Sequence, residues 1–214
     1  MKDIIIAGAG HLGLDIYNLL EEINSVKRLW NIKGFINDIP VDLDRFKLPI
    51  KILGTINDWQ PSDNEVFAMA IGSPSGRKMV AEKLIRRGAV FETLISPYAQ
   101  VSKTAKIGNG SVIFRDCLIA PCTTLGQFTC IGHSTSIGLD ASVGEYSNTA
   151  LRVNIYQDVK VGCACQIWSS SVILNSVGDN SIVGAGSVVI SKVKPCTRVL
   201  GNPAQEFGRT DEGV

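Results

Sequence analysis

The residues best suited to chemistry stand near the amino terminus, in the run Gly8-Ala9-Gly10-His11-Leu12-Gly13. The run follows an apolar segment at residues 3–7, predicted to be a buried parallel strand, and precedes an apolar-periodic helix that reaches about Glu22. A G-x-G-x-x-G between a strand and a helix is the dinucleotide-binding arrangement. Its glycines permit a tight turn, and the start of the helix offers N–H groups to a phosphate. The same glycines would also suit a tight turn that binds nothing.

Polar residues also follow the next two predicted strands. Asn37 and Asp38 come after a strand over residues 33–36, near the place where an acidic residue would meet a ribose hydroxyl. Gly72 and Ser73 end a strand over residues 66–71 and precede a helix over about 75–87. Ligands of parallel α/β sheets bind outside the carboxyl ends of the strands. The predicted substrate-binding residues are therefore Gly8, Gly10, His11, Gly13, Asn37, Asp38, Gly72, Ser73 and Arg77.

The elements that must position these residues alternate as strand, helix and strand. That order predicts a small, Rossmann-like, doubly wound parallel sheet. A fourth segment at residues 90–95 completes it, so the sheet ends within the first hundred residues. This is too short for the second half of a full NAD domain, which argues against an oxidoreductase and favours binding of part of a nucleotide.

Residues 101–190 repeat with a period of six. An aliphatic residue starts each unit, Thr149 is the gap in this series, and a two-residue phase shift precedes Val177. Four places after each aliphatic residue stands a small or β-branched one. Such a period is typical of hexapeptide β-helices, in which three units close a coil of eighteen residues. The aliphatic column fills the interior, and the glycine that often follows each aliphatic residue is expected to relieve backbone strain at the corners.

Composition narrows the functional classes. The chain has 214 residues, a net charge of +1 and 45% apolar residues, so nothing indicates a nucleic-acid surface. We expect two domains, residues 1–97 and 98–214. The six cysteines lie in or near the repeat without histidines to complete a metal site, which predicts reduced thiols and no metal. Without a signal-peptide pattern or an apolar run of eighteen residues, the expected location is the cytoplasm.

The chain resembles bacterial sugar O- and N-acyltransferases of the sialic-acid O-acetyltransferase (NeuD-like) type, within the hexapeptide-repeat superfamily. The resemblance covers nearly the whole chain. It rests on the repeat and on the following motifs: Gly8-Ala9-Gly10-His11-Leu12-Gly13, Phe35-Ile36-Asn37-Asp38, Ala70-Ile71-Gly72-Ser73 with Arg77, Leu94-Ile95-Ser96-Pro97, Gly184-Ala185-Gly186-Ser187 and Gly201-Asn202-Pro203-Ala204.

The resemblance implies an acetyl-CoA-dependent enzyme that acylates an amino or hydroxyl group of a nucleotide-linked sugar. The β-helix would be left-handed, and three chains would associate with acetyl-CoA in the groove between neighbours. The amino-terminal domain would hold the nucleotide-sugar, with the base or ribose near Asn37-Asp38. The CoA-binding residues would be Asn148, Gly184, Ala185, Gly186, Asn202 and Pro203.

The sequence departs from the family where relatives carry their catalytic histidine. That position is Leu139, and Asn148 stands where a second histidine is frequent. Asp140 is the nearest ionisable candidate, although a solvated aspartate is a weak base at neutral pH. Either the acceptor amine attacks the thioester with little help from a base, or the chain is an impaired relative that retains nucleotide-sugar binding as a structural or regulatory module. Phe114, Tyr156 and Trp168 would form aromatic walls of a groove or simply pack at the surface.

Overall fold

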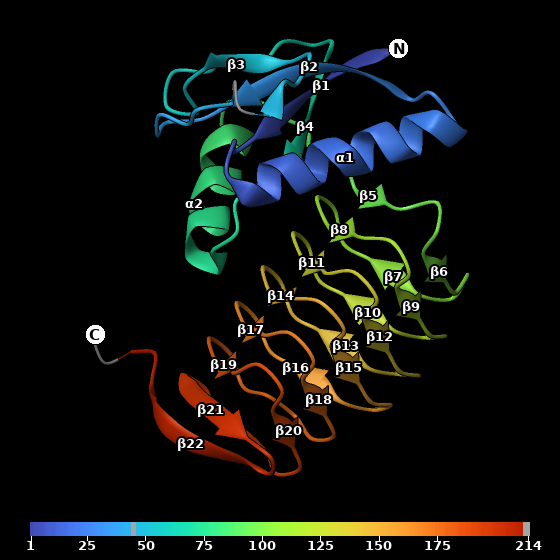
Figure 1. Cartoon of the computed structure of the whole chain (residues 1–214), viewed down its shortest axis with the longest axis vertical. Coiled ribbons are helices and arrows are strands. Elements are labelled where there is room, and N and C mark those ends of the chain that lie inside the picture. The colour runs from blue at the N-terminus through green and yellow to red at the C-terminus, as the bar shows by residue number, and fades with distance from the viewer. Residues whose placement is uncertain (44–45, 212–214) are drawn as a thin grey trace. The chain divides into compact units, whose positions relative to one another are not determined.

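The computed structural model describes residues 1–43 and 46–211 and divides into two compact units, Met1–Pro97 and Tyr98–Val214 (Figure 1). The two α-helices of the described residues lie in the first unit, together with a parallel sheet. The second is a stack of short parallel strands.

The first unit is built around a four-stranded sheet with the order β3-β2-β1-β4. Its elements are β1 (Lys2–Ala7), α1 (His11–Val26), β2 (Trp30–Ile36), β3 (Lys51–Gly54), β4 (Glu65–Met69), α2 (Pro74–Ile85) and β5 (Leu94–Ile95). All pairings within this sheet are parallel. The chain leaves the central strand β1 toward β2 and β3 and then returns to its other side with β4. The strand order therefore reverses between β1 and β4.

Continuous apolar runs explain strands β1 and β4. Ile4, Ile5 and Ile6 of β1 are fully buried, as are Val66 and Phe67 of β4, which is the pattern of strands covered on both faces. Two features differ from the sequence prediction. Strand β3 was not foreseen because it is a half-exposed edge strand without an apolar run. The segment at residues 90–95 forms only one bridge, from Phe67 to Phe91, and the two-residue strand β5.

The second unit is a parallel β-helix in which the short strands of successive coils stack into three faces (Figure 1). Face 1 contains β6 (Gln100–Val101), β9 (Leu118–Ile119), β12 (Ser136–Ile137), β15 (Asn154–Ile155), β18 (Val172–Ile173) and β20 (Val188–Val189). Face 2 contains β7 (Lys106–Ile107), β10 (Thr124–Leu125), β13 (Ser142–Val143) and β16 (Lys160–Val161). Face 3 contains β8 (Val112–Ile113), β11 (Cys130–Ile131), β14 (Asn148–Thr149), β17 (Gln166–Ile167), β19 (Ile182–Val183) and β21 (Thr197–Gly201), and β21 pairs antiparallel with β22 (Ala204–Arg209).

The strand register confirms the coil predicted from the period of six and extends it. Val143 pairs with Val161, one coil of 18 residues further on. The next pairing joins Val161 to Val177 and the one after it joins Val177 to Val193, so these coils are shorter by two residues. The first shortening is the phase shift visible in the sequence. The second, before Val193, was missed because the repeat ends one unit later in the β21–β22 hairpin.

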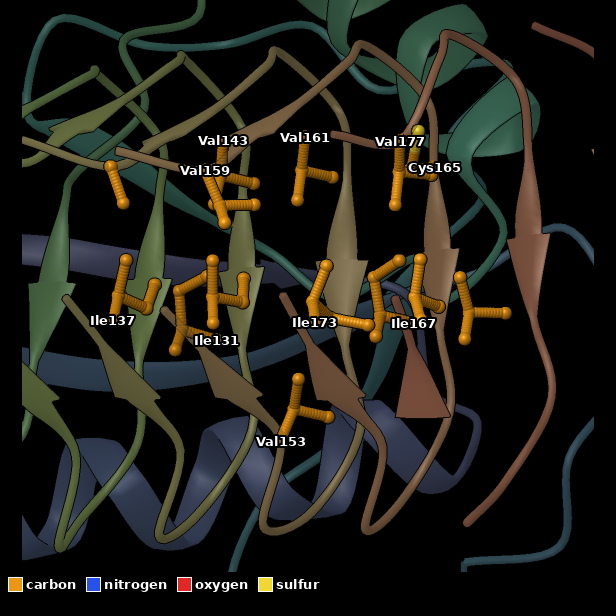
Figure 2. Close-up of a cluster of buried hydrophobic side chains, with 14 of the residues drawn as sticks. Ile131, Ile137, Val143, Val153, Val159, Val161, Cys165, Ile167, Ile173 and Val177 are labelled. Atoms are coloured by element: carbon orange, nitrogen blue, oxygen red, sulfur yellow. The ribbon is translucent and has the colours of Figure 1, made fainter. Parts of the chain in front are cut away.

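Two columns of side chains hold the coils together. The aliphatic column is almost fully buried, with Ile131, Ile167 and Ile173 each at most 1% exposed (Figure 2). The small column is equally buried, and its hydroxyls donate to backbone carbonyls of the next coil, as from Ser147 Oγ to Gly162 O at 2.7 Å. Cysteines replace hydroxyls in this column, and burial raises the pKa of the Cys117 and Cys165 thiols to about 11.

The glycines after the aliphatic residues do not relieve backbone strain, so that expectation is wrong. Gly138 is one of them, and its φ is not positive. A Cβ there would lie 2.5 Å from the backbone nitrogen of Gln157 in the next coil, so the glycine provides room for a neighbouring backbone. The left-handed residue lies two places further on and is usually not glycine, as at Asp140 (φ 55°) and Tyr146 (φ 59°).

Candidate functional site

The predicted binding residues of the first unit lie at the carboxyl edge of its sheet. Strands β1, β2 and β4 are parallel and end at Ala7, Ile36 and Met69. The Gly8–Gly10 turn follows β1, and the segment 70–73 follows β4. The two loops flank the position where the strand order reverses, which is where open α/β sheets bind ligands.

The turn after β1 requires two of its three glycines. Gly8 has φ +116°, and a Cβ on it would lie 2.7 Å from the carbonyl oxygen of Ala70. A Cβ on Gly13 would lie 2.4 Å from the carbonyl oxygen of Gly8. Gly10 is different, because a Cβ there would meet nothing within 4 Å. The motif therefore reflects tight packing at Gly8 and Gly13 and open space at Gly10.

Open space at Gly10 coincides with an uncapped helix. Gly10 is the N-cap of α1, brings no side chain that could accept from the helix, and is followed by a first turn without acidic residues. The N–H groups of this turn are therefore left for water or for an anion. His11 is exposed beside them.

Asn37 and Asp38 have different roles in this site. Asn37 Oδ1 accepts from the Ala9 N–H at 3.1 Å, and its amide donates to the carbonyl of Ile39. The Asn37 side chain thus links the end of β2 to the glycine turn. Asp38 is exposed, and its Oδ1 accepts from the Asn57 N–H at 2.9 Å. The exposed carboxylate of Asp38 is suited to accept a hydrogen bond from a ribose hydroxyl.

The loop after β4 is held from beneath by Arg77. Gly72 and Ser73 are exposed, and Ser73 caps α2 by accepting from the Gly76 N–H at 3.3 Å. Arg77 is only 2% exposed, and its guanidinium donates to the carbonyls of Ile71 at 2.9 Å and Gly72 at 3.1 Å. Sequence reasoning placed Arg77 among the residues that bind the ligand. The structure instead engages it with the backbone of the loop.

In the β-helix, Leu139 and Asp140 lie at the edge between faces 1 and 2. Both are exposed, and the Asp140 N–H donates to the Pro121 carbonyl of the previous coil at 3.2 Å. A groove of about 490 Å³ lies beside them. Its lining combines apolar side chains, among them Leu118, Leu139, Tyr156 and Val172, with the polar side chains Ser136, Asn154 and Gln157.

Asn148 lies on face 3, on the side of the prism opposite the edge that carries Asp140. Its Oδ1 atom is buried and has no hydrogen-bond partner among the described residues. An unpaired buried acceptor costs about 1–3 kcal/mol, which a donor from a ligand or another chain would offset. Asp140 and Asn148 therefore do not meet within one chain.

The two carboxyl-terminal motifs meet at the edge between faces 3 and 1. The Gly184 N–H donates to the Val199 carbonyl at 2.8 Å, and the Gly201 N–H donates to Ser187 Oγ at 3.2 Å. Ala185 and Gly186 are exposed at this corner, and Asn202 and Pro203 are exposed at the tip of the β21–β22 hairpin.

The three aromatic residues of the repeat differ in environment. Phe114 is buried and stacks on His133, with ring centroids 4.6 Å apart. Tyr156 lines the groove beside Leu139 and is 53% exposed, and Trp168 is 52% exposed. Only Tyr156 is a wall residue of this groove.

Sequence reasoning missed Asn57, whose N–H holds the Asp38 carboxylate and whose amide oxygen accepts from the Lys83 ammonium. No local pattern could have revealed it, because it lies in an irregular loop. Within residues 1–43 and 46–211 there is no cluster of three His, Cys, Asp or Glu suited to a metal ion. Neither helix in this described part is long and apolar enough to span a bilayer.

Known proteins resemble the chain over two different extents. No protein-family model matches it. A UDP-N-acetylbacillosamine N-acetyltransferase of Bacillus subtilis (strain 168) is 31% identical over 113 residues, which cover 53% of this chain. The match spans only about half of that relative, 51% of its length.

Solved structures match almost the entire chain. WeeI from Acinetobacter baumannii AYE has a TM-score of 0.71 at 21% identity, covering 97% of this chain and 100% of that one. PerB from Caulobacter crescentus, solved with CoA and GDP-perosamine, has a TM-score of 0.67 at 19% identity and covers 97% and 98%. The acetyltransferase domain of PglB from Neisseria gonorrhoeae FA1090, solved with acetyl coenzyme A, has a TM-score of 0.64 at 22% identity and covers 96% and 99%. At these identities the likeness establishes the fold of both units.

Proposed function

We propose that the protein transfers an acyl group, acetyl in the first instance, from acyl-CoA to the amino group of a nucleotide-activated sugar. The observation that carries this proposal is the uncapped start of α1 at the switch point of the sheet, in a chain that also carries a β-helix. The relative matched in sequence is named as an N-acetyltransferase of a UDP-linked sugar, and two of the matched structures contain CoA or acetyl coenzyme A.

In this proposal the first unit is a Rossmann-like domain that binds the nucleotide-sugar. The phosphates lie against the Gly8–Gly13 turn, where free N–H groups and the positive end of α1 favour an anion. The Asp38 carboxylate accepts from a ribose hydroxyl. His11 is exposed at the same edge and contacts the ligand, whereas Asn37 holds the turn in place.

The second unit is a left-handed β-helix that binds the acyl donor. Asn148 supports the proposal because its buried oxygen has no donor among the described residues, so a ligand or a second copy is free to supply one. The paired motifs around Gly184–Gly186 and Asn202-Pro203 form an exposed ledge of backbone and small side chains, which suits the extended arm of CoA. Since this ledge, Asn148 and Asp140 lie on different sides of the prism, a complete site needs more than one copy.

Self-association as a homotrimer would assemble that site. Exposed apolar side chains gather along the edge that follows face 1, where Tyr156, Leu174 and Ile190 occupy equivalent places in successive coils and are 41–53% exposed. Leu118 and Leu139 continue this surface at 49% and 45% exposure. Covering these five side chains removes apolar area from water, at about 25 cal/mol per Å².

Chemistry at this site follows from proximity more than from a base. The amine nitrogen of the sugar forms a bond to the thioester carbonyl carbon, the carbon–sulfur bond breaks, and CoA leaves as the thiol or thiolate. The amine proton passes to water or to Asp140. Holding two substrates together supplies about 7–11 kcal/mol, whereas a general base contributes about 10²–10⁴-fold in rate. We also propose that the protein is of the NeuD-like type and that it acts in the cytoplasm.

One observation favours a second candidate function. The position of the family's base is occupied by an apolar side chain, Leu139, which lines the groove and cannot accept a proton. This fits a catalytically impaired homologue that keeps nucleotide-sugar binding as a structural or regulatory module.

The two candidates are separated by incubating the protein with acetyl-CoA and 4-amino sugars linked to UDP, GDP or dTDP, while CoA and acetylated sugar are followed by mass spectrometry. Product formed above the uncatalysed rate supports the transferase. Binding of one nucleotide-sugar by calorimetry without product supports the module. Light scattering tests the trimer independently, and a stable monomer would remove the shared site.

A further inference from the structure

The Arg77 side chain lies buried beneath the loop that follows β4 and donates hydrogen bonds to its backbone. The side chain is almost fully buried, while Gly72 and Ser73 directly above it are exposed. Its Nε donates to the Ile71 carbonyl and its Nη2 to the Gly72 carbonyl. Its backbone N–H donates to the Ser73 carbonyl at 2.8 Å, as part of the first turn of α2. Three successive carbonyls are thus fixed by one residue.

This anchoring sets the direction of the amides on the other side of the loop. A trans peptide is planar, so the carbonyl of one residue and the N–H of the next point in opposite directions. With the carbonyls of Ile71 and Gly72 directed at the buried guanidinium, the N–H groups of Gly72 and Ser73 point away from it. They face the exposed side of the loop, at the carboxyl edge of the sheet.

The loop is also coupled to the turn that follows β1. The Ala70 N–H donates to the Ala7 carbonyl at 2.9 Å, and the Ala70 carbonyl occupies the space that a Cβ on Gly8 would need. A shift of the loop after β4 would therefore alter the wall against which the Gly8 turn is packed. Both walls of the switch point depend on the position of the Arg77 guanidinium.

We propose that Arg77 is a positioning residue for the nucleotide-sugar site, acting through the Ile71–Ser73 backbone without touching the ligand. This inference rests on the proposed function. Loss of the guanidinium leaves the carbonyls of Ile71 and Gly72 without these donors, and the loop turns to solvate them. The Gly72 and Ser73 amides then lose their direction, and the nucleotide-sugar binds more weakly although no ligand contact has been deleted.

The test compares Arg77→Met and Arg77→Lys with the wild-type protein. Arg86→Met is the matched control, because Arg86 is the exposed C-cap at the other end of the same helix, and its Nε donates to the Glu82 carbonyl within α2. For Arg77→Met we expect the KM for the nucleotide-sugar to rise about tenfold. The KM for acetyl-CoA and the kcat at saturation should stay within about twofold of wild type. A tenfold change in KM corresponds to about 1.4 kcal/mol, which is the scale of one lost charge-assisted hydrogen bond. Arg77→Lys should recover part of the loss, because its ammonium donates to one carbonyl.

Three outcomes would overturn the inference. One is a variant whose melting temperature falls while both KM values stay at wild-type level. Another is an equal rise of both KM values, and the third is a complex with bound nucleotide-sugar in which the guanidinium contacts a phosphate. If Arg77→Met does not fold, calorimetric titration of Arg77→Lys with UDP, GDP and dTDP takes its place, and unchanged affinity for the diphosphate that wild type binds would refute the role. Absence of acyl transfer by the wild type contradicts the proposed function alone, because the binding measurement still tests Arg77.

Discussion

Replacing Gly8 by alanine should damage the first unit and leave the β-helix intact. Alanine at φ +116° occupies a sparsely populated backbone region, which costs about 1–3 kcal/mol. Its Cβ would also stand 2.7 Å from the Ala70 carbonyl oxygen, an overpacking cost of about 1–3 kcal/mol. If the two costs add, unfolding of the first unit becomes easier by about 2–6 kcal/mol, a large part of the 5–15 kcal/mol typical of a domain.

The chain offers a matched control two residues away. Gly10 has φ −75°, and a Cβ on it meets nothing within 4 Å. Gly10→Ala should therefore cost less than about 1 kcal/mol, the loss of a favourable N-cap residue. The two variants add the same methyl group to the same turn, so the difference between them isolates the backbone strain and the contact with Ala70.

Tryptophan fluorescence in urea measures this difference. Trp30 and Trp59 lie in the first unit, and Trp30 is 9% exposed, whereas Trp168 in the second unit is already 52% exposed when folded. The fluorescence change therefore reports chiefly on the first unit, whose transition is fitted separately because two units need not unfold together. Equal midpoints for Gly8→Ala and Gly10→Ala would refute the reasoning. So would a Gly8→Ala protein that binds the nucleotide-sugar as tightly as wild type.

Three further predictions follow from the β-helix. Leu139→His should raise acyl transfer by at least about tenfold, with a half-maximal rate near pH 6.5, whereas Gln157→His, one coil away in the same groove, should not; equal rates in the two variants would contradict the assigned position of the base. Burial raises the pKa of the Cys117 and Cys165 thiols to about 11, so both should resist alkylation at pH 8. Because the pKa in the folded state exceeds that in the unfolded state, the contribution of the two thiols to stability is complete below about pH 8.5 and is lost as the pH rises through 11. The urea midpoint should therefore be lower at pH 10 than at pH 8. Gly138→Ala should destabilise the β-helix by about 1–3 kcal/mol, because its Cβ would lie 2.5 Å from the next coil's backbone.

Gly186→Asn is the control for the last of these variants. Gly186 has φ +69°, and a Cβ on it would meet nothing within 4 Å. Asn180 adopts φ 57° at the equivalent corner place. The asparagine variant should unfold within about 1 kcal/mol of wild type, since Asn tolerates the left-handed region. A larger loss of unfolding free energy in Gly186→Asn than in Gly138→Ala would contradict the different roles assigned to the two glycines.

The period of six was enough to predict the coil, because equivalent positions in successive coils are buried in the same way and therefore require the same type of side chain. Thr149 did not disturb it: the residue stays buried in the aliphatic column, and its Oγ1 accepts from the Gly132 N–H at 3.1 Å. The sequence could not reveal the role of the Gly138 position, since steric exclusion by another coil's backbone depends on stacking geometry.

The candidate site was harder to foresee, because a motif specifies residue types and not the partners they meet. Asn37 and Arg77 have the residue types of ligand-binding side chains, yet their hydrogen bonds to Ala9 and to the Ile71 and Gly72 carbonyls hold loops. Asn57 gave no signal, because its contact with Asp38 joins an irregular loop to a strand end. The side chains at such an edge are predictable by position, whereas their partners depend on how the loops pack.

The two coil lengths of the β-helix bear on how such a chain can grow or shrink. Coils of 18 and 16 residues stack in one prism because the shortened corner removes two residues without moving the aliphatic column. A duplication or deletion of one whole coil keeps every column in register. An insertion of one residue instead moves the interior side chains that follow it to the exterior, and the exterior ones to the interior, unless a corner accommodates the extra residue. Over evolutionary time, therefore, the β-helix can gain or lose whole coils, while the same β21–β22 hairpin still closes its carboxyl-terminal end.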